Sequence, residues 1–459
     1  MPNLKTTQTK SATIVSVTVN AVGVDPIGFL KYTQSEKSGL WTKGDGWIAH
    51  SGCLQTLSYE SSDSSGDRFS EIRSQAQNLL DSSDSSSRPI RFYGGFSFGP
   101  DHVPEGVWKG FPAGLFHLPE FELEGGSRQS ARLQGHAIVR HDSIDLEQVR
   151  EELFEKTERV CGLLRKKCKQ NEVAKNGGDL HNKEDFDRTI WESMIENALE
   201  NIDRGLLSKV VLARTQDLRF NEFIDPVDIV NKLWKANPGS HVFLIRTSRD
   251  SCFLGAAPEI VTDVSKGQFQ ATAVAGTAGR GHDKKEQQTL AESLLGSTKD
   301  GIEHCITRDD ILTRLGTLVD DVDAQVSPHV LTLGEMQHLE TEIKAKLREG
   351  IDAIQVLQTL HPTPAVCGLP RQKALDFIER EEPFERGWYA GPVGWFDTDG
   401  DAMFVPALRC AVVTGKDWRL FAGAGIVAGS DATSEWEETG VKFTPVTKAL
   451  SENNTGAFF

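Results

Sequence analysis

A glycine-rich stretch that runs directly into an acidic helix constrains this chain more than any other feature. Residues 420–442 read LFAGAGIVAGSDATSEWEETGVK, so an apolar strand end opens into a Gly/Ser/Asp turn whose polar residues can cap a helix. Glu435 and Glu438 are three residues apart and Lys442 follows four residues later, which puts all three on one helical face. Two carboxylates beside a glycine-lined floor suit a hard divalent cation. An exposed helix end with a Glu–Lys pair explains the stretch equally well.

A second acidic pair lies far upstream. The segment 297–312 predicts a helix, and on it Asp300 and Glu303 are again three residues apart, with His304 beside them. Two such pairs from separate helices can furnish an oxygen cage for one Mg²⁺. His304 fits a packing role better than a ligand role, because magnesium prefers oxygen donors.

The composition narrows the class of protein and its partners. The chain has 459 residues, of which 38% are apolar, and a net charge of −16, which is typical of a globular protein with a substantial core. No apolar run reaches the length of about 18 residues that spans a membrane. The acidic balance argues against nucleic acid or an anionic membrane as a partner. Seven scattered cysteines without metal-ligand spacing indicate reduced thiols in a cytoplasmic protein.

The first third of the chain has the pattern of short strands joined by turns. A charged, periodic helix is expected over 145–170 and a linker over 176–179. A further helix is expected to start at Asp185 or Asp187 and to end at Gly205. The strands predicted before these helices span residues 12–19, 47–49, 90–98, 115–121 and 131–139.

Lys209 interrupts an otherwise apolar strand, which is predicted over 206–214. It alternates with Val210 and Leu212 and therefore projects from the opposite face of the sheet. Burying a charge requires compensation, so this lysine is either functional or a strand-end residue whose head reaches water. The spacing alone leaves both interpretations open.

Other short motifs place polar groups at strand ends. Glu259 follows a predicted strand after small residues, and a glycine turn over 275–280 can bring backbone N–H groups to an anion. Arg409 lies inside the apolar strand predicted over 407–413. Pro406, just before it, predicts an edge strand or a bulge.

Taken together, these motifs resemble the chorismate-utilising enzymes, and within them the isochorismate synthases of menaquinone and siderophore synthesis. The resemblance runs in order over about residues 185–450 and is looser before residue 150, where GGFSFGP carries it. The matching motifs, each followed by one of its residues, are KVVLAR (Lys209), GAAPE (Glu259), AGTAGR (Gly276), KDGIEH (Glu303), QHLET (His338), LHPTPAVCG (His361), RGWYAGPVGW (Arg386), ALRCA (Arg409), GAGIVAGS (Gly423) and EWEETGVK (Glu438).

The resemblance implies an α+β fold in which two large, mainly antiparallel sheets stack as a sandwich with helices outside. It divides the chain into residues 1–175, the N-terminal part of the sandwich, and residues 176–459, the chorismate-binding catalytic region, within one compact structural domain. The site is expected in a cleft near one end of the sandwich.

The resemblance also implies a reaction, the Mg²⁺-dependent interconversion of chorismate and isochorismate. Water adds at ring carbon 2 while hydroxide leaves carbon 4. Lys209 is then the base that activates water, and Glu259 is the acid that protonates the leaving hydroxyl. A lysine accepts a proton only when neutral, and we expect its apolar strand and a nearby cation to favour that form. Glu259 is expected to be buried, because burial raises the pKa of a carboxyl group.

Metal and substrate contacts follow from the same resemblance. Mg²⁺ is expected on Glu303 and Glu438, where it binds the ring carboxylate. Asp300 and Glu435 stand close by or act through water. The residues expected to contact chorismate are Gly276, Thr277, His338, Ala365, Leu408, Gly423, Lys442 and, at the pyruvyl carboxylate, Tyr389 and Arg409.

Three alternatives stay open. An anthranilate or aminodeoxychorismate synthase subunit uses ammonia from a glutaminase partner, but those enzymes generally lack lysine at the position of Lys209. A salicylate synthase goes on to eliminate pyruvate, and such enzymes often carry a hydroxyl residue where Ala365 lies. A non-catalytic binder of anionic metabolites needs neither Lys209 nor Glu259. We therefore expect a cytoplasmic, monomeric isochorismate synthase without a glutaminase subunit, and the long N-terminal part favours the menaquinone type over the siderophore type.

Overall fold

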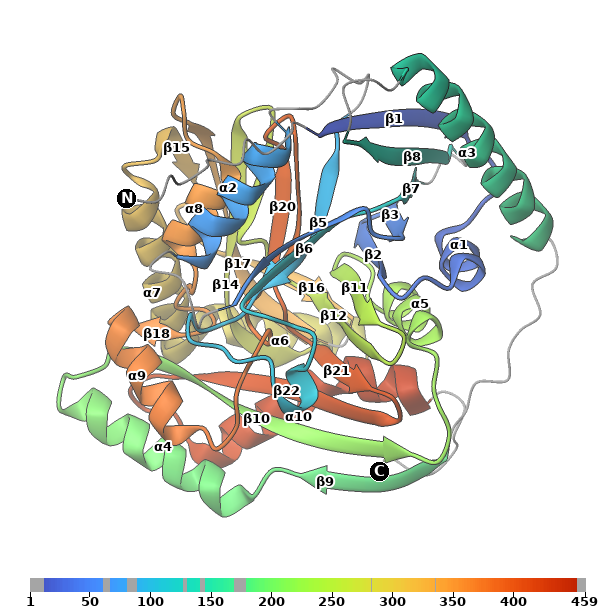
Figure 1. Cartoon of the computed structure of the whole chain (residues 1–459). Coiled ribbons are helices and arrows are strands. Elements are labelled where there is room, and N and C mark those ends of the chain that lie inside the picture. The colour runs from blue at the N-terminus through green and yellow to red at the C-terminus, as the bar shows by residue number, and fades with distance from the viewer. Residues whose placement is uncertain are drawn as a thin grey trace, which may run out of the picture.

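The structure of the protein is a computed structural model that describes residues 12–60, 67–80, 89–126, 130–140, 145–168, 179–281, 283–334 and 336–451. Within these residues, two large antiparallel sheets form the centre of the molecule and helices cover them (Figure 1). The predicted α+β sandwich is therefore confirmed. Residues 169–170 of the predicted charged helix and 176–178 of the predicted linker lie outside the described residues.

The first sheet has twelve strands and joins early and late parts of the chain. The two parts meet where β2 pairs with β11 in antiparallel register, with Leu40 opposite Leu244. In order across the sheet, the strands are β1 (Thr13–Asn20), β8 (Arg132–Val139), β7 (Phe121–Gly125), β3 (Gly46–Ser51), β2 (Ser38–Lys43), β11 (His241–Ser248), β12 (Ser251–Ala257), β21 (Cys410–Thr414), β22 (Asp417–Ile426), β10 (Lys209–Phe220) and β18 (Gly368–Leu369), with β9 (Leu180–Asp185) also paired to β10.

The second sheet has ten strands and joins the same two parts, because β5 pairs with β19 and places Tyr93 opposite Trp395. In order across the sheet, its strands are β15 (Val319–Ala324), β17 (Met336–Leu347), β14 (Gln268–Gly279), β13 (Thr262–Ser265), β20 (Ala402–Pro406), β19 (Pro392–Asp397), β5 (Arg91–Phe96), β6 (Gly114–Leu118) and β4 (Gln55–Tyr59), with β16 (His329–Leu333) also paired to β17. Neither sheet is built from one part of the chain alone.

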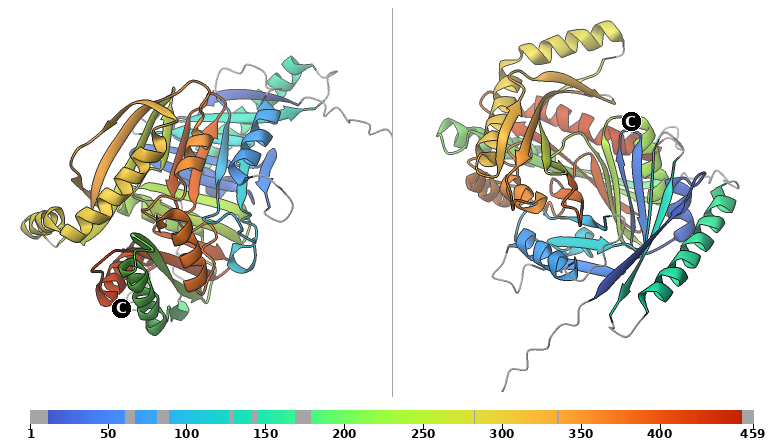
Figure 2. Two further views of the ribbon diagram at one scale, coloured as in Figure 1. Left: turned by 90° about the vertical axis from the view of Figure 1, so that its left-hand side faces the viewer. Right: turned by 90° about the horizontal axis from the view of Figure 1, so that it is seen from above.

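Helices cover the outside of the sandwich. They are α1 (Pro26–Thr33), α2 (Arg68–Leu80), α3 (Leu146–Cys168), α4 (Arg188–Asp203), α5 (Pro226–Ala236), α6 (Lys284–Gly296), α7 (Thr298–Leu315), α8 (Ala353–Leu360), α9 (Arg371–Glu381) and α10 (Ala432–Ser451), with one 3₁₀ turn at Gly106–Trp108. Helix α6 extends outward at the opposite end of the molecule from α3 (Figure 2). Among the described residues, no helix has the length and apolar character needed to cross a membrane.

Aspartate side chains begin several of these helices. The Asp187 carboxylate accepts a hydrogen bond from the backbone N–H of Thr189, so α4 starts after Asp187, while Asp185 ends strand β9. Asp352 forms a reciprocal capping box with Gln355 at the start of α8. Such caps satisfy backbone donors that have no partner inside the helix, and each contributes about 1 kcal/mol.

A cluster of buried aromatic rings lies next to β22. Trp108 stacks on Phe421 with ring centroids 5.5 Å apart, and Phe111 meets Trp388 edge-on at 5.3 Å. The Trp388 indole also donates a hydrogen bond to the carbonyl of Pro112 at 2.8 Å. Burying side chains of this size contributes about 1.5–3 kcal/mol each, so Trp108 is held against β22 and Trp388 against the segment of Phe111 and Pro112.

Two local predictions were wrong in detail. The predicted glycine turn over 275–280 belongs mostly to strand β14, where Gly276 forms a bulge with a φ of +72°. Pro406 is the last residue of the internal strand β20 and pairs with Pro392, the first residue of β19. A proline at a strand end costs little ladder pairing, so Pro406 needs neither an edge strand nor a bulge.

Candidate active site

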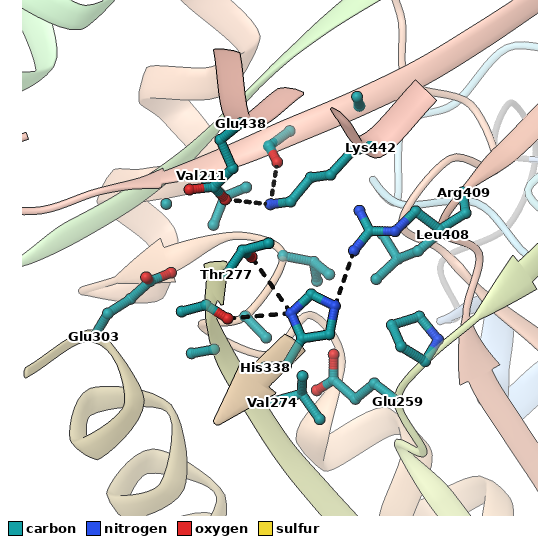
Figure 3. A pocket seen from close by; sticks show the side chains of 18 of the residues that line it. Val211, Glu259, Val274, Thr277, Glu303, His338, Leu408, Arg409, Glu438 and Lys442 are labelled. Carbon is teal, nitrogen blue, oxygen red and sulfur yellow. Dashed lines mark hydrogen bonds and ion pairs between the residues drawn. The ribbon is translucent and has the colours of Figure 1, made fainter. Parts of the chain in front are cut away.

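A pocket opens where side chains of β14, β17, β22, α7 and α10 converge (Figure 3). Part of its wall is backbone, because Gly423 and Gly425 of β22 contribute no side chains. The lining residues are Val211, Pro258, Glu259, Val274, Ala275, Gly276, Thr277, Glu303, His338, Ala365, Val366, Tyr389, Leu408, Arg409, Phe421, Ala422, Gly423, Gly425, Glu438 and Lys442.

Lys209 stands directly behind the pocket wall. It is the first residue of β10 and is fully buried, so its head does not reach water. Its Nζ lies 3.0 Å from Oε1 of Glu303, which lines the pocket, and 3.4 Å from Oγ1 of Thr307. The charged group in contact with Lys209 is thus a carboxylate rather than the predicted cation.

Glu259 presents a buried carboxyl group to the pocket. It follows strand β12 and is 2% exposed, and its Oε1 has no hydrogen-bond partner among the described residues. Burial raises the pKa of Glu259 to about 8, against the opposing effect of Lys209. The carboxyl group is therefore mostly protonated at neutral pH and can donate a hydrogen bond.

His338 is a neutral ring that connects two pocket walls. Its Nδ1 lies 3.1 Å from the carbonyl oxygen of Gly276 and 3.3 Å from Oγ1 of Thr277, and its Nε2 lies 3.3 Å from Nη2 of Arg409. A carbonyl only accepts and a guanidinium only donates, so the hydrogen must sit on Nδ1. Burial lowers the pKa of His338 to about 3, which keeps the ring uncharged.

Arg409 is a buried cation at the pocket wall. It lies between β20 and β21, with a φ of +49°, rather than inside the predicted strand. Burial lowers the pKa of its guanidinium to about 10, so the charge remains at neutral pH. Within the described residues no carboxylate forms an ion pair with it, and its Nη2 donates to His338. Such a group attracts an anionic ligand, because leaving a buried cation uncompensated is costly.

Tyr389 faces the glycine floor of the pocket. Its ring stacks on Phe421 with centroids 5.1 Å apart and planes 12° apart. A Cβ placed on Gly423 would lie 2.7 Å from the Tyr389 hydroxyl oxygen, which is closer than real Cβ atoms come. The glycine therefore makes room for the phenol.

Two acids of α10, Glu435 and Glu438, are each paired with a lysine. Oε1 of Glu438 lies 2.6 Å from Nζ of Lys442, which also donates to the carbonyl of Gly423 at 2.8 Å. The buried Glu435 accepts a hydrogen bond from Lys299 of α7. Burial alone raises the pKa of Glu438, but Lys442 holds it below its ordinary value.

The acids of α7 lie close enough to those of α10 for their charges to interact. Burial raises the pKa of Asp300, a hydrogen bond from Ser297 opposes this, and the charges of Glu303 and Glu438 raise it further. A Cβ on Gly425 would lie 2.1 Å from Oε1 of Glu303, so the carboxylate fits only because this residue is glycine.

The donor set suits a hard cation such as Mg²⁺, because it consists of carboxylate oxygens that repel one another. In the part of the chain that the structure describes, no group of three or more His, Cys, Asp or Glu side chains is already gathered as a metal would require. Lysines hold Glu303, Glu435 and Glu438 instead. The residues fit the ion in chemistry, and a bound ion would have to compete with these lysines.

Most of the predicted site residues come together. Those that line the pocket are Glu259, Gly276, Thr277, Glu303, His338, Ala365, Tyr389, Leu408, Arg409, Gly423, Glu438 and Lys442. Lys209, Asp300 and Glu435 lie outside the lining. Lys209 contacts Glu303, and Asp300 lies 3.0 Å from the Cβ position of Gly276.

Sequence reasoning missed eight residues of the pocket wall, which are Val211, Pro258, Val274, Ala275, Val366, Phe421, Ala422 and Gly425. Val211 and Phe421 are apolar strand residues, and their pattern looks like ordinary core. Gly425 belongs to the glycine-rich stretch, and its spacing from Gly423 could have predicted its place in the pocket wall. Every second residue of a strand faces the same side, so Gly425 shares the face of Gly423.

Comparisons with known proteins agree with this geometry. The family model described as chorismate binding enzyme matches residues 3–451. The chain is 34% identical over 365 residues to the salicylate biosynthesis isochorismate synthase of Pseudomonas aeruginosa, covering 79% of this chain and 74% of that protein. It is 28% identical over 460 residues to isochorismate synthase MenF of Bacillus subtilis, covering 97% of this chain and 95% of that protein. The solved structure of the menaquinone-specific isochorismate synthase MenF of Escherichia coli matches with a TM-score of 0.79 at 27% identity, covering 95% of this chain and 94% of that one.

Proposed function

This chain belongs to the chorismate-binding enzymes, and on that premise we propose that it is an isochorismate synthase that interconverts chorismate and isochorismate. One observation carries the proposal. Glu259, a buried and mostly protonated carboxyl group, lines the pocket, and the buried Lys209 lies behind the pocket wall with its Nζ 3.0 Å from Oε1 of Glu303, which also lines the pocket. An exchange of hydroxyl groups needs such a base and such an acid.

The two groups divide the proton transfers. Lys209 Nζ takes a proton from the water that attacks ring carbon 2, and Glu259 gives its proton to the hydroxyl that leaves carbon 4. One water molecule is consumed and one is released, so the reaction needs no oxidant or further substrate. Because the pKa of Glu259 is about 8, its carboxyl group is mostly protonated at neutral pH and has a proton to donate.

Substrate anions are assigned to the cations of the pocket. Arg409 has no carboxylate partner among the described residues and can accept one from the ligand, next to the Tyr389 hydroxyl. His338 orients Arg409 because its Nδ1–H is bound to the carbonyl of Gly276. Leu408 and Ala365 supply apolar wall, and Ala365 offers no hydroxyl, which favours a reaction that stops at isochorismate.

Mg²⁺ is part of the proposal. Glu303 and Glu438 line the pocket and would hold the ion, with Asp300 and Glu435 beside them. When bound, the ion supplies positive charge to a substrate carboxylate. Because Glu303 is paired with Lys209 and Glu438 with Lys442, the ion would compete with these two lysines for the carboxylates.

In the same proposal water is the nucleophile and no glutaminase subunit is needed, since Lys209 provides the base that activates water. It also has the protein act in the cytoplasm, which agrees with the free thiols of Cys53, Cys161, Cys252, Cys305, Cys367 and Cys410. Between menaquinone and siderophore synthesis, the long match to the menaquinone-specific structure favours the former.

Product analysis tests the proposal. The protein is incubated with chorismate and Mg²⁺, with and without ammonium, and the products are separated by chromatography while pyruvate is measured. Isochorismate as the sole product under both conditions is expected. Aminated product with ammonium, or salicylate together with pyruvate, would assign the chain to one of the rival activities instead.

A further inference from the structure

A second groove lies on another flank of α10, away from the reaction pocket. It is formed by β9, β10 and α10, which run close together in Figure 1, and it includes Lys183, Arg214, Gln216, Trp436, Gly440 and Phe443. None of these residues lines the reaction pocket. The proposed activity therefore leaves the groove without a role.

The helix presents different flanks to the two cavities. With 3.6 residues per turn, Glu438 and Lys442 lie on one side of α10 and enter the reaction pocket. Trp436, Gly440 and Phe443 lie roughly opposite and enter the groove. The same helix thus touches both cavities.

Arg214 is a buried cation in this groove. It is 4% exposed, and its Nε and Nη2 donate to Oγ1 of Thr439 at 2.7 Å and to the carbonyl of Trp436 at 3.2 Å. These acceptors are neutral, and no carboxylate forms an ion pair with Arg214 within the described residues. Burial lowers the pKa of its guanidinium to about 10, so the charge persists at neutral pH.

Aromatic rings flank this cation. The Arg214 guanidinium carbon lies 3.7 Å from the ring centre of Trp436 and 5.0 Å from that of Phe443. The acid at the rim, Asp185, is already compensated, because it lies 3.3 Å from Nζ of Lys183 and accepts from Nε2 of Gln216 at 2.5 Å. The groove therefore offers a guanidinium whose hydrogen-bond acceptors are neutral, and which Asp185 influences only through its charge, beside apolar ring surface.

We propose that this groove is a second binding site for a small aromatic carboxylate, with its carboxylate on Arg214 and its ring beside Trp436 and Phe443. A guanidinium binds a carboxylate through charge-assisted hydrogen bonds. The neighbouring rings favour a flat apolar body over a bare anion. A ligand that meets both requirements carries a carboxylate on an aromatic ring.

Calorimetric titration of the full chain tests the site with three probes. Benzoate carries a ring and a carboxylate, acetate only the carboxylate, and benzyl alcohol only the ring. Benzoate is expected to bind at least about ten-fold more tightly than either of the others, because each part adds a favourable contact.

Substitutions of Gly440 assign the binding to the groove. A Cβ on Gly440 would lie 3.7 Å from Nη2 of Arg214, which is ordinary contact, so Gly440→Ala should leave benzoate affinity within about two-fold. Gly440→Leu fills the space in front of Arg214 and should weaken benzoate at least about ten-fold. Arg214→Gln should weaken it similarly, with circular dichroism confirming the fold.

The reaction pocket provides the control, because it too contains an unpaired guanidinium. Arg409→Ala removes that guanidinium and should leave unchanged the benzoate binding that Gly440→Leu weakens. The proposal is overturned if benzoate gives no heat at millimolar concentration, or if acetate binds as tightly as benzoate. It is also overturned if Gly440→Leu binds benzoate like the parent chain, or if Arg409→Ala alone abolishes binding. In those cases Arg214 only fastens α10 to β10.

Discussion

Two buried glutamates in different parts of the sandwich have opposite surroundings. Glu122 of β7 and Glu259 after β12 are each 2% exposed. Oε1 of Glu122 accepts from Nη1 of Arg91 at 2.6 Å, and its Oε2 accepts from the Tyr93 hydroxyl at 2.6 Å. Oε1 of Glu259 has no hydrogen-bond partner among the residues that the structure describes, and the group lines the reaction pocket.

The difference shows that burial of a charge does not by itself indicate function. Each oxygen of Glu122 accepts from an internal donor, and the His50 ring stacks on Tyr93 at 4.2 Å, so this carboxylate is held within the fold and does not line the reaction pocket. Around Glu259 and Arg409 hydrogen-bonding capacity is left over at a cavity. Unused capacity beside a cavity is what a ligand can satisfy.

The largest expected effect is on stability, at the buried ion pair of Glu122 and Arg91. Glu122→Gln leaves Arg91 without its buried counter-charge and should lower the free energy of unfolding by about 3–5 kcal/mol. Glu124→Gln, whose side chain is 40% exposed, is the matched control and should cost less than about 1 kcal/mol. Denaturant unfolding measures both. The comparison fails if Glu122→Gln is as stable as the parent chain, or if its folded fraction has lost activity.

The next effect is on activity, at the reaction pocket beside Glu303 and Lys209. Gly425→Ala introduces a Cβ 2.1 Å from Oε1 of Glu303 and 3.1 Å from Cε of Lys209. Displacing these groups by about 1 Å should lower kcat/KM by about 10²-fold. Gly162→Ala, where nothing lies within 4 Å, is the control. Chorismate kinetics that stay within a few-fold of the parent would show that the glycine floor does not set the geometry.

An intermediate effect concerns pH. His117 lies opposite Tyr93 in the strand register, and both its ring nitrogens are buried without partners among the described residues. Burial lowers the pKa of His117 to about 3, so the folded state stays neutral while the unfolded chain takes up a proton below about pH 6.5. Stability is therefore present above that pH and is lost as the pH falls.

His117→Leu should remove that contribution. Between pH 7 and pH 5 the variant should lose about 2 kcal/mol less unfolding free energy than the parent chain. Denaturant titrations at the two pH values give the difference directly. Equal losses in both chains would mean that the buried imidazole does not contribute to acid sensitivity.

The smallest expected effect concerns Mg²⁺. Lys299 of α7 pairs with Glu435 of α10, and its side chain is 33% exposed. If the ion competes with this lysine, Lys299→Met should tighten Mg²⁺ binding by about two- to five-fold, the range of a partly exposed ion pair. Calorimetric titration with Mg²⁺ in the absence of chorismate measures it. Weaker or unchanged binding would remove Lys299 from competition for the metal site.

The sequence predicted best what depends on local spacing. The i,i+3 pairs at Asp300 and Glu303 and at Glu435 and Glu438 lie on helices α7 and α10, as expected. The fold class followed from motifs that run in order along the chain. Helical periodicity is a local property, so no knowledge of tertiary contacts was needed.

The remaining features depend on partners far away in the chain. The bulge at Gly276 exists because β14 pairs with β17, and a turn-like sequence does not reveal that register. The carboxylate beside Lys209 comes from α7, and the cation that the mechanism suggested there is not the group in contact. The groove at Arg214 likewise requires β10 and α10 to meet. Such pairings arise from packing and have no local signal.

The central claim is that the reaction pocket with Lys209 and Glu259 is catalytic. Steady-state kinetics of Lys209→Ala over a full chorismate range test this claim most directly. If Lys209 is the base, kcat should fall by at least about 10²–10⁴-fold while KM changes little. Thr307→Val, which removes the 3.4 Å contact to Lys209 and a 3.2 Å hydrogen bond to the backbone carbonyl of Glu303 within α7, should stay within a few-fold of the parent chain. A raised KM with kcat nearly unchanged in Lys209→Ala would contradict the account and leave Lys209 as a partner of Glu303 alone.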